Sequence, residues 1–168
     1  MGFPTQTDNL IQRFKMPKIG QAQIKERIEF LIKEAEEGDT DSMRFLADIY
    51  SDSEYLPKDY FAAEAWLRKA AELGDDEAKF QLANMLKNSN GVAKNLEEAF
   101  NIFHELSFDG YSDAMIEVGK ALIEGIGVPK DEELGSRYLK FGESINEDIT
   151  EREEREDKMY EDLKIKKK

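Results

Sequence analysis

A five-residue motif recurs every 36 residues, and this spacing limits the folds open to the chain. The motif reads GDTDS from Gly38, GDDEA from Gly74 and, more loosely, GYSDA from Gly110. The same spacing relates further sets of positions: Leu46, Leu82 and Val118; Ala47, Ala83 and Gly119; Tyr50, Leu86 and Leu122; Asp59, Asn95 and Asp131; and Trp66, Ile102 and Tyr138. A fixed period of this length is typical of solenoids, in which each repeat is one supersecondary unit.

The apolar pattern inside each repeat predicts two helices. First helices are expected near 40–52, 76–88 and 112–124, and second helices near 59–73, 95–109 and 131–144, after a lone second helix near 20–37. In the first unit, Ser42, Leu46, Ile49 and Tyr50 fall at i, i+4, i+7 and i+8, which places them on one largely apolar stripe. Because one helix pair cannot bury such a stripe alone, neighbouring pairs are expected to stack.

Short polar residues and glycines mark the expected helix ends. Asp59, Asn95 and Asp131 stand just before the second helices, where a side-chain oxygen can accept a hydrogen bond from a free backbone N–H. Gly38 and its equivalents 36 and 72 residues later follow the second helices, where a left-handed residue commonly ends a helix. These signals favour an all-α chain.

Two segments resemble a known repeat family. The pattern A-x3-V-G-x2-L-x2-G-x-G-V-x2-D runs from Ala114 to Asp131, and AWLRKAAELG runs from Ala65 to Gly74. Both resemble the Sel-one-like repeat (SLR) family, a relative of the tetratricopeptide repeat, over roughly residues 20–145. The resemblance implies a right-handed α-α superhelix (solenoid) of about three 36-residue helix pairs with extra terminal helices. It also implies a concave face lined by first helices and a role as an adaptor, scaffold or complex subunit, although a fold does not fix a function.

The units depart from the family pattern in two ways. The Gly-x-Gly-Val turn is complete only at 125–128; the second unit keeps half of it at 89–92, and the first replaces it at 53–56. The last pair has Gly135 and Gly142 where Ala99 and Leu106 stand one repeat earlier. Since glycine inside a helix costs about 1 kcal/mol relative to alanine, we expect the last pair to be less rigid.

Charge is distributed unevenly along three expected regions. These are an N-terminal arm or short helix at 1–19, the SLR solenoid at 20–145, and a charged C-terminal capping helix with a basic tail at 146–168. The whole chain has a net charge of −13; residues 1–20 contribute +2 and residues 146–168 contribute −2, so residues 21–145 carry −13. Such a field repels phosphate backbones, which makes a nucleic-acid partner unexpected. It favours a basic protein partner or simply solubility.

Several classes of protein are disfavoured by what the sequence lacks. No apolar run approaches the roughly 18 residues of a membrane span, and residues 1–20 lack the order of a secretory signal. The absence of cysteine excludes a disulfide framework and thiolate metal sites. We therefore expect a cytoplasmic protein with no membrane partner.

The outer face of the first helices predicts a protein-binding groove. Its nine positions are Arg44, Asp48, Ser51, Phe80, Asn84, Lys87, Ile116, Lys120 and Ile123. Phe80, Ile116 and Ile123 are apolar where a merely solvated helix would be polar, so they are candidate anchors inside a charged rim. The alternative is that these residues pack against the terminal helices.

Catalytic signals are absent. His104 is the one histidine, and its repeat equivalents Arg68 and Lys140 predict an exposed position. There is no histidine cluster for a metal, no nucleophile elbow and no phosphate-binding loop. The repeat explains Gly125-Ile126-Gly127 as a turn between helices. The sequence thus predicts no enzyme, no cofactor and no metal.

Three kinds of function fit this sequence. The leading hypothesis is a protein–protein interaction module, an adaptor or scaffold that binds another, basic protein through the concave groove, more often as a monomer than as an oligomer. The alternative within that class is an immunity or inhibitor protein that neutralises a basic toxin. A hydrolase using groove carboxylates and a self-assembling structural protein are less favoured.

Overall fold

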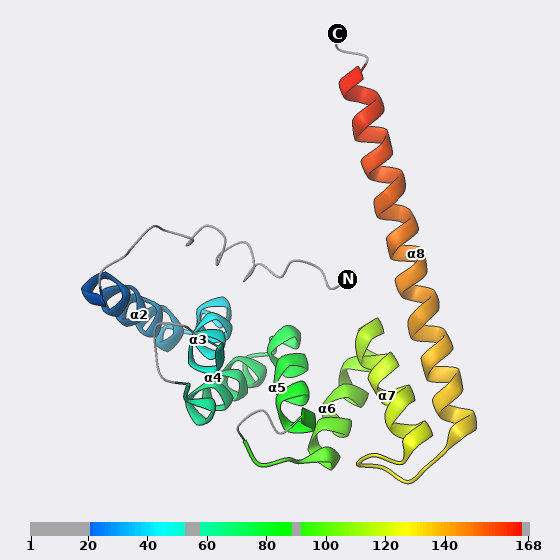
Figure 1. Ribbon diagram of the computed structural model, residues 1–168, viewed down its shortest axis with the longest axis horizontal. Helices are drawn as coiled ribbons and strands as arrows, with labels where there is room; N and C mark the ends of the chain where they lie inside the picture. The colour runs from blue at the N-terminus through cyan, green and yellow to red at the C-terminus, as the bar shows by residue number, and fades with distance from the viewer. Residues whose placement is uncertain (1–20, 53–57, 89–91, 166–168) are drawn as a thin grey trace. The chain divides into compact units, whose positions relative to one another are not determined.

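The computed structural model describes residues 21–52, 58–88 and 92–165, and every regular element in this part of the chain is an α-helix (Figure 1). The helices are α2 (Gln21–Glu36), α3 (Thr40–Asp52), α4 (Tyr60–Glu72), α5 (Asp76–Asn88), α6 (Leu96–Phe108), α7 (Ser112–Glu124) and α8 (Glu132–Ile165). The first helices α3, α5 and α7 begin 36 residues apart, as do the second helices α4, α6 and α8. The predicted helix pairs and their period are confirmed.

The second helices are capped as predicted, by the same hydrogen bond in each of the three repeats. Asp59 Oδ1 accepts a hydrogen bond from Ala62 N at 3.0 Å. Its equivalents Asn95 and Asp131 accept from the N–H three residues on, at 3.1 and 2.9 Å. The backbone N–H of each capping residue also donates to the preceding first helix; that of Asp59, for example, donates to Tyr50 O at 2.7 Å. Each cap therefore fixes both the start of a helix and the geometry of its pair.

The recurring Gly-Asp motif marks the turn from a second helix into the next first helix. Gly38 and its two equivalents have φ of 102°, 88° and 90°, the left-handed region that favours glycine. Asp39 Oδ2 accepts from Ser42 N at 2.7 Å, and Asp75 Oδ1 accepts from Ala78 N at 2.8 Å. In the third copy Tyr111 replaces the aspartate, and α7 begins without a side-chain cap.

Two compact units make up the chain, one reaching Met85 and the other taking most of the chain from Leu86 on. In the first unit, α3 packs against α2 and α4. Its core contains Leu46, Ala47, Ala63, Leu67 and Ala70, each at most 3% exposed. The three alanines among these residues let the helix axes approach closely.

In the second unit, α7 packs against α6 and α8, and its crossing with α8 depends on glycine. A Cβ built on Gly119 would lie 2.8 Å from Gly135 O, and one built on Gly135 would lie 2.7 Å from Gly119 O. A Cβ on Gly142 would lie 2.8 Å from Ser112 O. Gly135 and Gly142 thus permit close contact between the backbones of α7 and α8. The lower rigidity expected of the last pair stays a prediction.

Helix α8 continues well beyond the expected end of the last pair. It is one helix from Glu132 to Ile165, so the expected boundary at residue 146 lies inside it. After Gly142 the sequence of this helix contains no glycine or proline, the two residues least compatible with a helix interior. The expected arm at 1–19 and the end of the basic tail, 166–168, lie outside the described residues.

Candidate protein-binding groove

The first unit contains a shallow open groove of about 500 Å³ between α3, the start of α4, and α5. Its floor is apolar, since Ala47, Leu67 and Met85 line it and are each at most 7% exposed. The half-buried rings of Tyr60 and Phe80 also line it. An apolar floor beside two aromatic rings can hold a buried side chain from another molecule.

Four of the nine predicted groove residues line this groove together: Asp48, Ser51, Phe80 and Asn84. All four are half-buried. Ser51 Oγ donates to Asp48 O at 3.2 Å, and Asn84 Nδ2 donates to Phe80 O at 3.1 Å. The polar side chains are thus anchored to their own helices on the groove wall.

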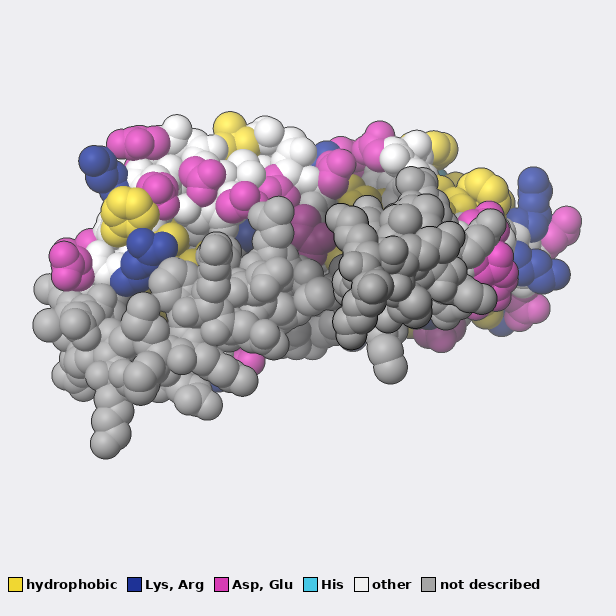
Figure 2. All heavy atoms as spheres, turned by 90° about the horizontal axis from the view of Figure 1, so that it is seen from above, with side chains coloured by type: hydrophobic (Ala, Val, Ile, Leu, Met, Phe, Trp, Pro, Cys, Tyr) yellow, Lys and Arg dark blue, Asp and Glu magenta, His cyan; other side chains and the backbone are white. Residues whose placement is uncertain are grey.

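The groove rim is acidic. Asp48, Asp52 and Glu77 line it with a single basic residue, Lys58. Lys58 Nζ lies 2.8 Å from Asp52 Oδ1 in an exposed ion pair; the hydrogen bond from Lys58 lowers the pKa of Asp52, and that from Asp52 raises the pKa of Lys58. Asp and Glu side chains are also spread over the described part of the face seen in Figure 2.

Sequence reasoning missed several lining residues. Tyr60, Lys58 and Gln81 were not among the predicted positions, yet all three line the groove. Tyr60 belongs to a second helix, and the prediction considered first helices alone. For Gln81, the sequence did carry one sign of a groove position, since this residue directly follows the predicted groove residue Phe80.

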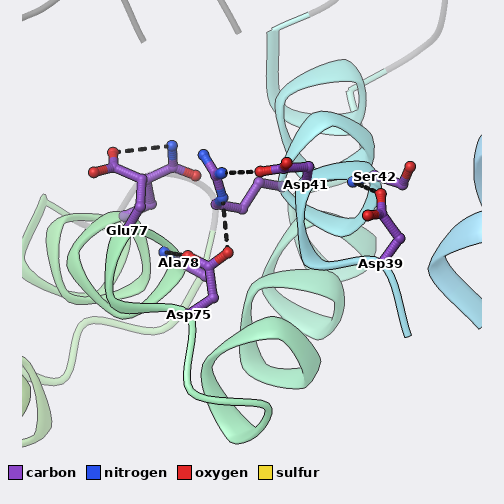
Figure 3. Close-up of polar contacts among 8 residues, drawn as sticks. Asp39, Asp41, Ser42, Asp75, Glu77 and Ala78 are labelled. Carbon is purple, nitrogen blue, oxygen red and sulfur yellow. Dashed lines mark hydrogen bonds and ion pairs between the residues drawn. The ribbon is translucent and has the colours of Figure 1, made fainter. Parts of the chain in front are cut away.

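Arg44, predicted on the groove, is held in ion pairs with Asp75 and Asp41, and Figure 3 labels these two partners. Its Nε donates to Asp75 Oδ2 at 3.1 Å, and its Nη2 donates to Asp41 Oδ1. The side chains of Arg44 and Asp75 are only 12% and 10% exposed. Burial alone would lower the pKa of Arg44, but the carboxylates of Asp75, Asp41 and Glu77 outweigh burial and raise it. Because Asp75 also caps α5, Arg44 ties α3 to the start of that helix.

Lys87 and Lys120, predicted on the groove in the second unit, converge on Glu117. Lys87 Nζ contacts Glu117 Oε2, and Lys120 Nζ lies 2.8 Å from Glu117 Oε1. Burial alone would raise the pKa of Glu117, but hydrogen bonds from Lys120 and Lys87 outweigh it and lower the pKa. Glu117 thus pairs with Lys87 within the second unit, and the sequence analysis did not single it out.

Replacing Glu117 with glutamine should reduce the acid sensitivity of the fold. Since the pKa of Glu117 is lower in the folded chain, its contribution to stability is present above the pKa of an unfolded glutamate and is lost as pH falls through the folded value. We expect wild-type stability to fall more steeply than that of Glu117→Gln between about pH 5 and pH 3. Urea unfolding at several pH values measures this difference, and parallel pH profiles would contradict it.

Ile116 and Ile123 pack against the part of α8 that the sequence analysis assigned to the last helix pair. Both are half-buried, and their Cγ1 atoms lie 2.9 Å and 2.8 Å from where a Cβ would stand on Gly142 and Gly135. Part of each side chain is therefore already covered within the second unit. Partner binding by these two residues stays a prediction.

His104 differs from its predicted exposed position. It is half-buried, and its ring contacts Phe100, Phe108 and Tyr138. Among the described residues, no group of three or more His, Asp and Glu side chains is placed to hold a metal ion. Nor is any described helix both long and apolar enough to cross a membrane.

Two known protein families match parts of this chain. Residues 40–75 match the Sel1 repeat, and residues 58–133 match the coatomer epsilon subunit. The Sel1-repeat-containing protein YjcO of Escherichia coli is 27% identical over 118 residues, which is 68% of this chain and 51% of YjcO. The chain thus spans about half the length of the curated relatives it matches.

Solved structures have the same fold. A Sel1 repeat protein from Oxalobacter formigenes superposes with a TM-score of 0.65 at 22% identity, covering 77% of this chain and 98% of that one. The c5321 protective antigen of uropathogenic Escherichia coli, described as displaying an SLR fold, also gives 0.65, at 27% identity over 70% of this chain and 25% of its own. Helicobacter pylori cysteine rich protein B gives 0.54 at 18% identity, covering 74% and 89%. The predicted SLR-type all-α superhelix is confirmed.

Proposed function

Because this chain is a Sel1-like repeat protein, we propose that it works by binding another protein, with the groove between α3, α4 and α5 as the binding surface. The fold favours a protein-interaction module over an enzyme, since Sel1 repeats generally form non-enzymatic interaction folds. One observation carries the proposal: Phe80 and Tyr60 stand over an apolar floor inside an acidic rim.

The groove has the composition expected of a recognition surface. Apolar anchors surrounded by polar residues are typical of the parts of an interface that contribute most to affinity. The three rim carboxylates against one amine favour a basic partner by charge complementarity. An adaptor or scaffold acting as a monomer is the simplest role for such a surface.

Site-specific photocrosslinking tests the proposed surface. A photoreactive phenylalanine analogue placed at Phe80 should form a covalent adduct with the partner in cells that express the chain, because this ring lines the groove. The same analogue at Phe61, whose side chain is 74% exposed on α4 and does not line the groove, should form none. Adducts at Phe61 alone would place the partner elsewhere on the chain.

A second candidate is an immunity or inhibitor protein that neutralises a basic toxin. The charge of −13 within residues 21–145 supports this candidate, since it would attract a strongly basic partner over long range. The two roles differ in what the chain does to its partner. An enzymatic partner that loses activity when the chain is added supports inhibition, whereas retained activity in the complex supports an adaptor.

A further inference from the structure

An aromatic row runs along one face of α6. Phe100, His104 and Phe108 are four residues apart, so they share one face of the helix. The repeat-equivalent rows are Glu64, Arg68 and Glu72 in α4, and Ser136, Lys140 and Ser144 in α8. In α4 that row is held by an Arg68–Glu64 ion pair at 2.7 Å. This row is therefore aromatic in α6, whereas the equivalent rows of the other two repeats are charged or polar.

The rings of this row are already ordered by one another. Phe100 and His104 are stacked with centroids 5.6 Å apart and an interplanar angle of 14°. His104 meets Phe108 edge to face at 4.7 Å, and Tyr138 of α8 lies 6.2 Å from His104, with its hydroxyl 3.4 Å from Nε2. Even so, Phe108 is 74% exposed. The row thus presents an exposed ring whose neighbours are fixed, which lowers the entropic cost of binding to it.

An acidic row lies directly beside the aromatic one. Glu97, Asn101, Glu105 and Asp109 are also four residues apart, each one residue after or three before a member of the aromatic row, and all four are exposed. No lysine or arginine occurs anywhere in α6. The two rows together combine ring faces with carboxylates on one helix surface.

This combination suits a cation that can also stack. The face of an aromatic ring attracts Lys and Arg, and the chain uses this contact itself, with Lys69 Nζ 4.3 Å from the centre of the Trp66 ring. Within the described parts of the chain, no such cation lies over Phe100 or Phe108. Arginine fits better than lysine, since its planar group stacks on a ring while pairing with a carboxylate.

We propose that the aromatic row Phe100–His104–Phe108 and the adjoining acidic row form a second docking surface, which binds an arginine-bearing segment of a partner protein. This surface lies wholly in the second unit and shares no residue with the groove. A single chain could then hold a partner at two places, or two partners at once.

Peptide titration of the full-length chain tests this surface. The probe is a short synthetic peptide of alternating arginine and glycine, compared with the same peptide carrying lysine for arginine, and NMR follows the amide and ring signals. The arginine peptide should bind more tightly and should shift the signals of Phe100, His104 and Phe108. Phe108→Leu keeps an apolar side chain but loses the ring, so it should weaken arginine-peptide binding about two- to five-fold.

Controls separate this surface from general attraction to an acidic protein. Phe61→Leu is the matched variant, because Phe61 is equally exposed but lies in a row with Ala65 and Lys69 rather than with other aromatic rings. It should leave the affinity unchanged, as should groove variants at Asp48 and Phe80. Equal binding by wild type and Phe108→Leu, equal losses for Phe61→Leu and Phe108→Leu, or shifts confined to the groove would each overturn the proposal.

Discussion

The substitution Gly127→Ala is expected to lower the free energy of unfolding by about 3 to 4 kcal/mol. Gly127 has φ of +72°, in the left-handed region, where a side chain costs about 1 to 2 kcal/mol. A Cβ at this position would also lie 2.1 Å from Leu96 O and 2.5 Å from Leu96 C. Leu96 is the first residue of α6, so its backbone cannot move aside without disturbing that helix. Urea unfolding followed by circular dichroism measures the loss.

Gly125→Ala is the matched control for this prediction. Gly125 has the same φ of +72°, but the nearest atom to its added Cβ is Lys130 Cβ at 3.3 Å, a side-chain contact that can relax. We expect the free energy of unfolding of this variant to fall only by the cost of a side chain in the left-handed region, about 1 to 2 kcal/mol. An equal loss of unfolding free energy in the two variants would contradict the prediction, because the close approach of Gly127 to α6 would then add nothing to the cost of a side chain.

The same turn shows how far the repeat period can predict structure. The period placed Asp59, Asn95 and Asp131 at the helix starts, and each one caps its helix as expected. Local rules suffice here, because a cap depends on a side chain and an N–H three residues away. The period also identified Gly125 and Gly127 as turn residues, but not the contact of Gly127 with Leu96, which lies 31 residues earlier in the chain.

Contacts between repeats cannot be predicted from the sequence of one repeat alone. Arg44 was assigned to the groove from its helix face, yet it pairs with Asp75, 31 residues further on. Gly135 was expected to weaken α8 from its propensity, yet it allows α7 and α8 to pack closely. In both cases the partner belongs to another helix, and its distance cannot be deduced from spacing along the sequence.

Part of the candidate groove could be predicted from the sequence, because the helical period determines which residues face outward. Asp48, Ser51, Phe80 and Asn84 belong to first helices whose outward face follows from the helical period, and these four line one groove. Tyr60 also lines it, but its position depends on how α4 packs against α3. Partner binding by all nine predicted residues stays a prediction, and the groove in the first unit is the part of it that can be tested most sharply.

Replacing Asp48 with lysine and Phe80 with alanine in one variant is expected to weaken partner binding about a hundred-fold. The first change reverses a charge on the acidic rim, and the second removes a ring that lines the groove. Truncation of a single buried anchor commonly costs a tenfold or larger loss of affinity, and a misplaced cation adds repulsion against a basic partner. Circular dichroism and thermal unfolding of the variant show whether the fold is retained.

The most direct test of protein binding through the groove is the dissociation constant of the crosslinked partner, once identified and purified, for three forms of the chain. These are the wild type, the variant with Asp48→Lys and Phe80→Ala, and a variant with Glu72→Lys and Phe61→Ala. The last makes the same change in charge and aromatic content at exposed positions of α4 that do not line the groove. Binding through the groove predicts the hundred-fold loss for the first variant and wild-type affinity for the second. Wild-type affinity in the groove variant, with its fold intact, would contradict it.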